Sequence, residues 1–230
     1  MDENTEAIEL PLFPLNTVLF PGQMLPLHIF EDRYQHMIRH CLAEALPFGV
    51  VLLRKGREVD DPSAEPYSVG TMAEIVESTH LPDGSLNIVT MGTERFRIRR
   101  LLHDQPYLRG EVDNYPLPDT DGEGSLEGLT EVVARGVARY IKLIAEAAGL
   151  HIKVEEMPET ARQVGFLAAV AMQIDNTEKQ TLLDSRSLRD ILIAEVTLLK
   201  RENALLAWMA SSKDWPQEVQ SGVSGTLLPN

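Results

Sequence analysis

The sequence has very little cysteine and no unbroken hydrophobic run long enough for a membrane helix. A single cysteine, Cys41, excludes an intramolecular disulfide and an all-cysteine metal site within one chain, which fits a reducing cytoplasm. A hydrophobic stretch at residues 10–31 is interrupted by Pro11, Pro14, Pro21 and Pro26, and acidic residues precede it. A secretory signal needs a basic start and an unbroken apolar core, and a spanning helix needs about 20 apolar residues. We therefore expect a cytoplasmic protein in which this stretch belongs to the folded body.

Positive charge is also scarce. The chain has 21 Lys and Arg against 35 Asp and Glu, which gives a formal net charge of −14. An acidic surface repels nucleic-acid phosphates and anionic membranes, so the composition argues against both as partners. The 230 residues, 43% of them hydrophobic, suffice for one or two domains with their own cores.

Sequence patterns of common catalytic sites are missing as well. The chain has no P-loop, no dinucleotide-binding glycine pattern, no HExxH or CxxC pair, and no GxSxG elbow around a serine nucleophile. These absences predict that the protein has no catalytic residues, no cofactor and no bound metal.

The features that are present divide at residues 116–128, a segment rich in proline, glycine and acidic residues. Before it, short apolar runs alternate with turn signals at Pro21-Gly22 and Asp83-Gly84, around one helix at 31–46 that Pro47 ends. Prolines within the first runs favour edge strands. After it, helical spacing is found near 125–148, 158–173, 177–184 and 187–210. The pattern predicts an α+β protein, with a barrel-like β domain at 8–116, a helical bundle at 123–212 and a loose tail at 213–230.

Two polar groups could suggest chemistry, and each has a simpler interpretation. His36 and His40 follow Asp32 at helical spacing, which metal ligands can use, but they lie opposite the apolar stripe, so we favour an exposed helix face. Ser85 could be a nucleophile, but the Asp-Gly pair before it predicts a hairpin and no base is indicated.

The end of the last predicted helix offers two further candidates. Ser211, Ser212 and Lys213 could form a Ser–Lys pair, but their position at a helix end lacks the rigidity that such a pair requires. Trp208 and Trp215 could belong to a contact surface, because tryptophan is enriched at interfaces; the alternative is packing within the bundle.

A basic stripe is the most interesting polar feature of the predicted β domain. Its members are Arg95, Arg97, Arg99, Arg100 and, on the next strand, Arg109. Alternation places the first three opposite Phe96 and Ile98. The stripe could contact phosphates or acidic peptides. We favour a solvated strand face paired with acids such as Glu94 and Glu111, because mixed surface charge is normal.

Several segments resemble, in order and spacing, the Lon N-terminal (substrate-binding) domain. They read "LPLFPLNTVLFPGQMLPLHIFEDRYQHMI", "FGVVLLRKG", "VGTMAEI", "LPDGSLNIVTMGTERFRI" and "YLRGEV". The first is most similar to free-standing bacterial members, and "NTEKQTLLDSRSLRDILIAEVTLLKREN" is similar to the helical part of Lon that follows the barrel. The resemblance covers about residues 8–205. It implies a PUA-like β pseudo-barrel followed by a helical bundle, in agreement with the predicted boundary.

In Lon proteases this region holds unfolded or tagged substrates and helps to assemble the hexamer, while separate ATPase and Ser–Lys protease modules do the chemistry. The chain ends before either module, so the resemblance implies a non-enzymatic module that binds unfolded polypeptide or a protein partner, and it leaves a homo-oligomer open. The alternatives are an RNA-binding PUA-like protein that uses the Arg95–Arg100 strand, and a peptidase. The family's motif residues here are Glu31, Arg33 and Tyr34. We expect them to orient the helix against the barrel rather than to contact substrate.

Overall fold

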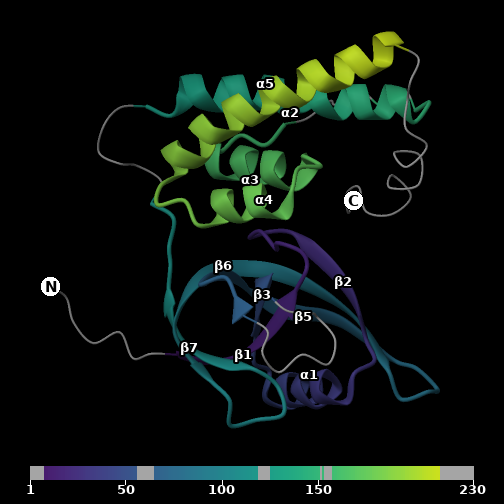
Figure 1. The fold of residues 1–230 in the computed structure, drawn as a ribbon, viewed down its shortest axis with the longest axis vertical. Helices are drawn as coiled ribbons and strands as arrows, with labels where there is room; N and C mark the ends of the chain where they lie inside the picture. Colours follow the sequence, from purple (N-terminus) through teal and green to yellow (C-terminus); the bar gives the residue numbers. More distant parts are fainter. Residues whose placement is uncertain (1–7, 56–64, 119–124, 151, 153–156, 213–230) are drawn as a thin grey trace, which may run out of the picture. The chain divides into compact units, whose positions relative to one another are not determined.

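A computed structural model describes residues 8–55, 65–118, 125–150, 152 and 157–212 (Figure 1). The chain divides into two compact units. The first, called the β unit below, comprises Met1–Leu117 and Ile174–Asp184. The second, called the helical unit, comprises Pro118–Gln173 and Ser185–Asn230.

The β unit is built on a closed ring of five strands. Its described elements are β1 (Ile8–Leu15), β2 (Met24–Ile29), α1 (Asp32–Glu44), β3 (Phe48–Lys55), β4 (Glu65–Pro66), β5 (Val69–His80), β6 (Leu86–Leu102), β7 (Arg109–Asn114) and α4 (Asn176–Leu183). The strand order β1-β7-β6-β5-β3 closes because β1 also pairs with β3, in parallel, while the other ring pairings are antiparallel. The strands outside the ring are β2, which pairs with β6, and β4, which pairs with β3. This arrangement confirms the predicted α+β fold with a pseudo-barrel.

The two faces of β1 contribute side chains to two different hydrophobic clusters, because successive side chains along a strand point to opposite faces. One cluster receives a side chain from every ring strand: Leu10, Leu12, Val51, Met72, Phe96 and Val112. The other joins the opposite strand faces to the apolar stripe of α1, through residues such as Phe13, Leu15 and Met37. Figure 1 shows α1 at the lower end of the β unit in that view. Burial on both faces explains why residues 10–15 read as a continuous apolar run.

The prolines of the opening stretch mark an edge in one strand but not in the other. β2 contains Pro26 and, among the described strands, pairs only with β6, so it is an edge strand, as predicted. β1 contains Pro11 and Pro14 but belongs to the ring, so the edge prediction is wrong there. The first half of β1 pairs with β7 and the second half with β3, and both prolines have a strand partner on one side only. A missing proline N–H can therefore face the unpaired side.

Both predicted turns are confirmed. Gln23 N donates to Phe20 O at 3.1 Å, and Gly22 between them has φ +81°, a left-handed conformation that glycine adopts without strain. The connection between β5 and β6 includes Gly84, with φ +88°. After this turn, the chain forms one long strand of 17 residues, β6.

The helical unit contains three described helices: α2 (Glu127–Ala147), α3 (Ala161–Ala171) and α5 (Leu188–Ser212). α2 packs on α5, where Asn203 Nδ2 donates to Gly136 O at 3.0 Å. Gly149, with φ +71°, follows the end of α2 as predicted. α3 begins at Ala161 after its N-cap Thr160, so Pro158 lies before the helix rather than in its first turn.

Helix α4 groups with the β unit, although residues 174–184 lie within the range predicted as helical bundle. Gln180 Nε2 donates to Val69 O on β5 at 3.0 Å, and Asn176 Nδ2 donates to Asn16 O at 2.6 Å. The N-cap of α4 is Asp175, whose carboxylate accepts from Thr177 N at 2.7 Å, so the helix begins at Asn176, one residue before the predicted start. Among the described residues, no helix is long and apolar enough to cross a membrane.

Candidate functional site

The outer face of β2, β6 and β5 forms an open hollow in the β unit. The register aligns Pro26 with Val89 and His28 with Asn87, and β5 brings Glu77 to the same face. Side chains at the intervening positions, such as Leu27, pack toward the core. The hollow has a volume of about 470 Å³ and is lined by Pro26, Leu27, His28, Glu77, Thr79, Asn87, Ile88 and Val89. It is therefore a surface site with both apolar and polar groups.

Exposed apolar side chains lie close in sequence to the residues that line this hollow. Phe30 is 56% exposed, and its ring is stacked on His28 with the centroids 6.0 Å apart. His28 Nδ1 lies 2.7 Å from Asn87 Oδ1, which fixes the imidazole across the two strands. Met91 on β6 and Val76 on β5 are also exposed. Grouped apolar side chains on a surface commonly mark a binding site for a protein or a ligand. We call this surface, with the hollow, the β2 face.

The free edge of β2 lacks a central hydrogen-bond donor. Gly92 N donates to Gln23 O at 2.9 Å, so the antiparallel pattern makes Met24, Pro26 and His28 the positions whose backbone groups point away from β6. Proline has no N–H, so the edge offers three carbonyls but only two donors. An incoming strand would therefore lose one hydrogen bond at the middle of β2.

The motif residues Glu31, Arg33 and Tyr34 contact one another at the start of α1. Arg33 Nε donates to Glu31 Oε2 at 3.0 Å, and the guanidinium lies 4.5 Å from the centre of the Tyr34 ring. Tyr34 is buried, with its ring centroid 4.1 Å from that of Phe13 on β1. This geometry suits residues that hold α1 against the barrel.

The structure places Arg95 in the interior, which differs from the predicted basic stripe. Arg95 is 3% exposed and donates to Leu183 O at the C-terminal end of α4, at 2.5 Å, and to Pro116 O at 3.3 Å. Its guanidinium lies 4.6 Å from the centre of the Tyr115 ring. A cation beside the last carbonyls of a helix is stabilising. Arg95 therefore holds α4 on the barrel and is not available to a partner.

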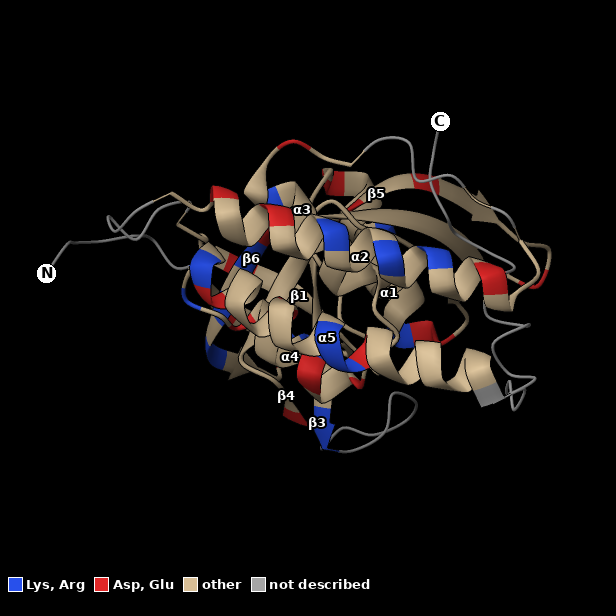
Figure 2. Cartoon of the chain, turned by 90° about the horizontal axis from the view of Figure 1, so that it is seen from above, with Lys and Arg blue, Asp and Glu red and all other residues tan. Residues whose placement is uncertain are grey.

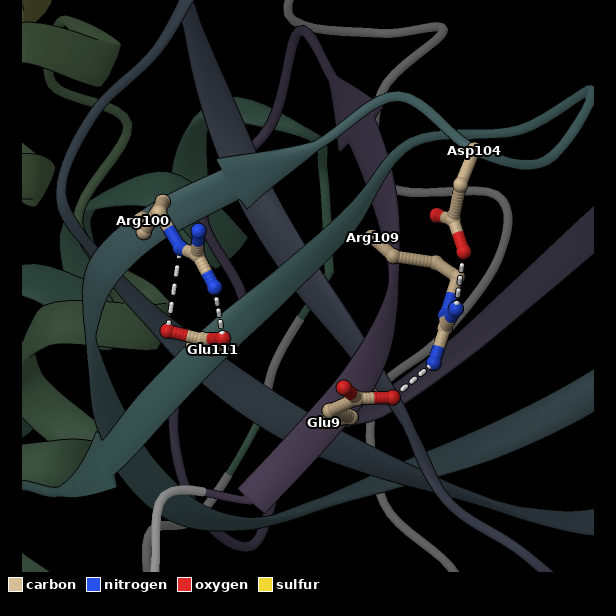
Figure 3. Close-up of polar contacts among 5 residues, drawn as sticks. All are labelled: Glu9, Arg100, Asp104, Arg109 and Glu111. Carbon is tan, nitrogen blue, oxygen red and sulfur yellow. Dashed lines mark hydrogen bonds and ion pairs between the residues drawn. The ribbon is translucent and has the colours of Figure 1, made fainter.

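The other arginines of the stripe pair with carboxylates. Arg97 Nη2 contacts Asp184 Oδ1 at 2.9 Å, and Arg99 pairs with Asp113 on β7. Figure 3 shows Arg100 in a two-pronged contact with Glu111, and Arg109 between Glu9 and Asp104. The sequence favours such pairing with acids like Glu94 and Glu111; Glu111 is a partner of Arg100, whereas none of these contacts involves Glu94. These contacts neutralise the stripe locally, which leaves little basic surface for phosphates.

The remaining candidates of the β unit show no catalytic arrangement. Asp32, His36 and His40 are exposed on α1, and the described part of the chain contains no group of three or more His, Cys, Asp or Glu that could hold a metal. Ser85 Oγ donates to Asp83 Oδ1 at 2.6 Å within the hairpin. Burial raises the pKa of Cys41 to about 11, so its thiol stays protonated and unreactive at neutral pH.

The candidates at the end of α5 are only partly within the described residues. Ser211 Oγ donates to Trp208 O at 2.6 Å, and Trp208 is well exposed. Lys213 and Trp215 lie outside the described residues. The Ser–Lys pair, which the sequence disfavours, therefore falls partly outside the described residues.

The fold and the β2 face together indicate the class of protein. It is an α+β protein that combines a pseudo-barrel, a surface with exposed apolar side chains and a helical unit. A sequence profile described as the ATP-dependent protease La (LON) substrate-binding domain matches residues 9–201, so the chain belongs to that family. The family is a substrate-binding domain and not a catalytic one. The predicted family and fold are thus confirmed.

Similar proteins agree with this assignment. The chain is 29% identical over 201 residues to "Lon protease 2" of Myxococcus xanthus and 30% identical over 224 residues to a Lon protease of Parabacteroides distasonis. The alignments cover 86% and 92% of this chain but 24% and 27% of those proteins, so the chain spans about a quarter of the length of these relatives.

Solved structures show the same fold. The crystal structure of a Lon N-terminal domain protein from Xanthomonas campestris matches with a TM-score of 0.60 and 29% identity, over 87% of this chain and 98% of that one. The N-terminal domain of Mycobacterium avium complex Lon protease matches with a TM-score of 0.63 and 17% identity, over 86% of this chain and 98% of that one.

Proposed function

We propose that this protein is a non-enzymatic module that holds segments of unfolded polypeptide on the β2 face. The observation that carries the proposal is the exposed Phe30 ring, stacked on His28 at the margin of the hollow. An apolar group held in place in the free protein can bind an unfolded chain without paying to be ordered first. Membership of a substrate-binding family supports the same conclusion.

Two features indicate how a client would bind. The rim of Phe30, Met91 and Val76 offers apolar contact to any extended segment rich in hydrophobic residues. The edge of β2 offers backbone hydrogen bonds, but Pro26 removes the middle donor. We therefore propose that side-chain contact contributes more to client affinity than strand addition, and that client selection is broad.

The test measures, by fluorescence anisotropy, the binding of this protein to a labelled client protein. The client is reduced and alkylated so that it stays unfolded. Phe30→Ser should weaken binding roughly tenfold, because an exposed aromatic anchor contributes on the order of 1–2 kcal/mol. The matched control is Leu46→Ser, which removes another apolar side chain that is 44% exposed, next to the C-terminal end of α1.

The control variant should bind the unfolded protein as the unaltered chain does. Equal affinities of the Phe30→Ser and unaltered proteins would contradict the proposed surface. Failure of every form to prefer the unfolded over the native form of the labelled protein would contradict the proposed function.

A further inference from the structure

The helical unit has a second surface, a groove between α2 and α5. The groove has a volume of about 350 Å³ and is lined by Val132, Arg135, Gly136, Arg139, Val196, Leu199, Lys200, Asn203 and Ala204. Its apolar floor follows from the close approach of the helices, because a Cβ atom at Gly136 would lie 3.0 Å from Leu199 Cδ1. We call this surface the α2–α5 groove; it lies wholly within the helical unit and does not depend on the β2 face.

The rim of the α2–α5 groove is cationic, which is unusual in a chain with a net charge of −14. Figure 2 shows blue bands along the middle of α2 and on α5. Arg135 and Arg139 are one helical turn apart on α2, about 6 Å along the axis, and Lys200 stands on α5. Three cations therefore border an apolar floor.

The charges of this rim are poorly matched, in contrast with four arginines of the predicted basic stripe in the β unit. Arg97, Arg99, Arg100 and Arg109 all contact carboxylates there. Within the part of the chain that the structure describes, Arg139 and Lys200 have neither a hydrogen bond nor an ion pair. Arg135 contacts Glu131 at 3.2 Å, but both side chains are about 70% exposed, and such a pair contributes little.

An orphaned polar atom lies at the floor of the same groove. Asn203 is 7% exposed and donates through Nδ2 to Gly136 O, while its Oδ1 has no hydrogen-bond partner among the described residues. Buried acceptors normally have a donor, so an unsatisfied one calls for an explanation. This oxygen has almost no exposed surface, so recognition by the groove depends on its apolar floor and its cationic rim.

We propose that the α2–α5 groove binds an acidic, amphipathic helix of a protein partner. The apolar floor, through Val132, Val196 and Leu199, would take the apolar stripe of such a helix, as helix-in-groove recognition requires. Acidic residues one turn apart on the partner match the spacing of Arg135 and Arg139. Nucleic acid fits less well, because its many phosphates would meet a chain with a net charge of −14, and an apolar floor offers a phosphate backbone nothing.

The experiment uses the full chain and two labelled synthetic peptides of equal length. Both carry leucine at helical spacing; one has glutamate at the flanking positions and the other has glutamine there. The glutamate peptide should bind more tightly, and added salt should weaken it because exposed charges are screened. The double variant Arg139→Gln with Lys200→Gln should lower its affinity roughly tenfold.

Matched controls separate this surface from other sites. Lys142→Gln removes an exposed α2 cation that pairs with Glu146 outside the groove, and it should bind the glutamate peptide normally. Phe30→Ser should also bind it normally, so failure of the β2 face and failure of the groove are distinguishable.

The proposal is overturned by any of three results. The first is equal binding of the two peptides. The second is an equal loss of affinity in Lys142→Gln and in the double variant. The third is a sedimentation experiment in which the unaltered chain is a dimer and the double variant is a monomer. That result would make a second copy of the chain the occupant of the groove.

Discussion

Arg95 and Arg97 stand two residues apart on β6 and face the same tyrosine ring, yet their environments differ. Their guanidinium carbons lie 4.6 and 4.1 Å from the centre of the Tyr115 ring. Arg95 is buried and bonded to backbone carbonyls, whereas the Arg97 side chain is 45% exposed and its partner Asp184 is 50% exposed. A single strand thus provides one structural cation and one surface cation.

Replacing each of these arginines by leucine should lower the stability of the protein by different amounts. Arg95→Leu should destabilise the protein by about 3 kcal/mol, because it leaves buried carbonyls without a donor. Arg97→Leu should cost less than about 1 kcal/mol, because its exposed ion pair is screened by water. Urea unfolding followed by circular dichroism measures both. Similar losses in the two variants would contradict the anchoring role of Arg95.

The alternation of side chains predicted the face that Arg95 occupies, but not its burial. Period-two alternation identifies which residues share a strand face. It contains no information on what covers that face, and here α4, about 90 residues later in the chain, does so. In the Glu31–Arg33–Tyr34 group, the contacts of Arg33 are local, whereas Tyr34 packs on Phe13 of the distant strand β1. The α2–α5 groove was missed, since its two sides come from distant helices.

At the scale of elements, glycines allow the ring strands to approach one another closely. A Cβ atom at Gly70 on β5 would lie 2.5 Å from Val50 O on β3 and 2.7 Å from Phe96 Cζ on β6. Gly22 in the first turn differs, because its φ is +81° but nothing lies within 4 Å of a Cβ there. The first glycine is required by space and the second by backbone conformation.

Alanine substitutions should therefore have unequal effects. Gly70→Ala should cost about 3 kcal/mol, because backbone and a packed ring must move to make room. Gly22→Ala should cost about 1 kcal/mol, the penalty of a left-handed conformation for a residue with a Cβ atom. Urea midpoints of the two variants provide the comparison. A larger loss for Gly22→Ala would show that the ring can expand at Gly70.

Elements with local signals could be predicted, and those fixed by distant pairing could not. The Asp83-Gly84 hairpin and the end of α2 before Gly149 depend on residues beside them in the sequence, and both are confirmed. The parallel pairing of β1 with β3 depends on a ring that closes through five strands, and no short pattern encodes it.

At the scale of the whole molecule, two kinds of carboxyl set the pH dependence of stability. Hydrogen bonds from Arg54 and Arg100 lower the pKa values of Glu65 and Glu111, so their contribution is lost as pH falls through those lowered values. Glu195 is fully buried in the helical unit, both its oxygens lack partners among the described residues, and burial raises its pKa well above the usual range. Its contribution is present below the unfolded pKa of about 4.3 and is lost as pH rises through the folded value.

Stability should therefore be greatest at about pH 5 and fall on both sides. Glu195→Gln removes the proton that is lost on the alkaline side, so it should flatten that decline, whose slope from one group is at most about 1.4 kcal/mol per pH unit. The measurement is a series of urea midpoints from about pH 5 to about pH 8 for both proteins. Parallel declines of the variant and the unaltered protein would show that Glu195 does not titrate in this range.

The position of α4 has a consequence for how the protein is made. The chain enters the helical unit at residue 118, returns to the β unit at 174 and leaves it again at 185. On a ribosome, the barrel strands emerge first, but the helix that covers Arg95 and Val69 emerges only after α2 and α3. Until α4 emerges, Arg95 and the Val69 carbonyl of the nascent barrel therefore lack their partners from α4. A chain released at residue 117 would lack these partners permanently. Because synthesis runs from the N-terminus, the β unit can be completed by α4 only after residues of the helical unit have emerged.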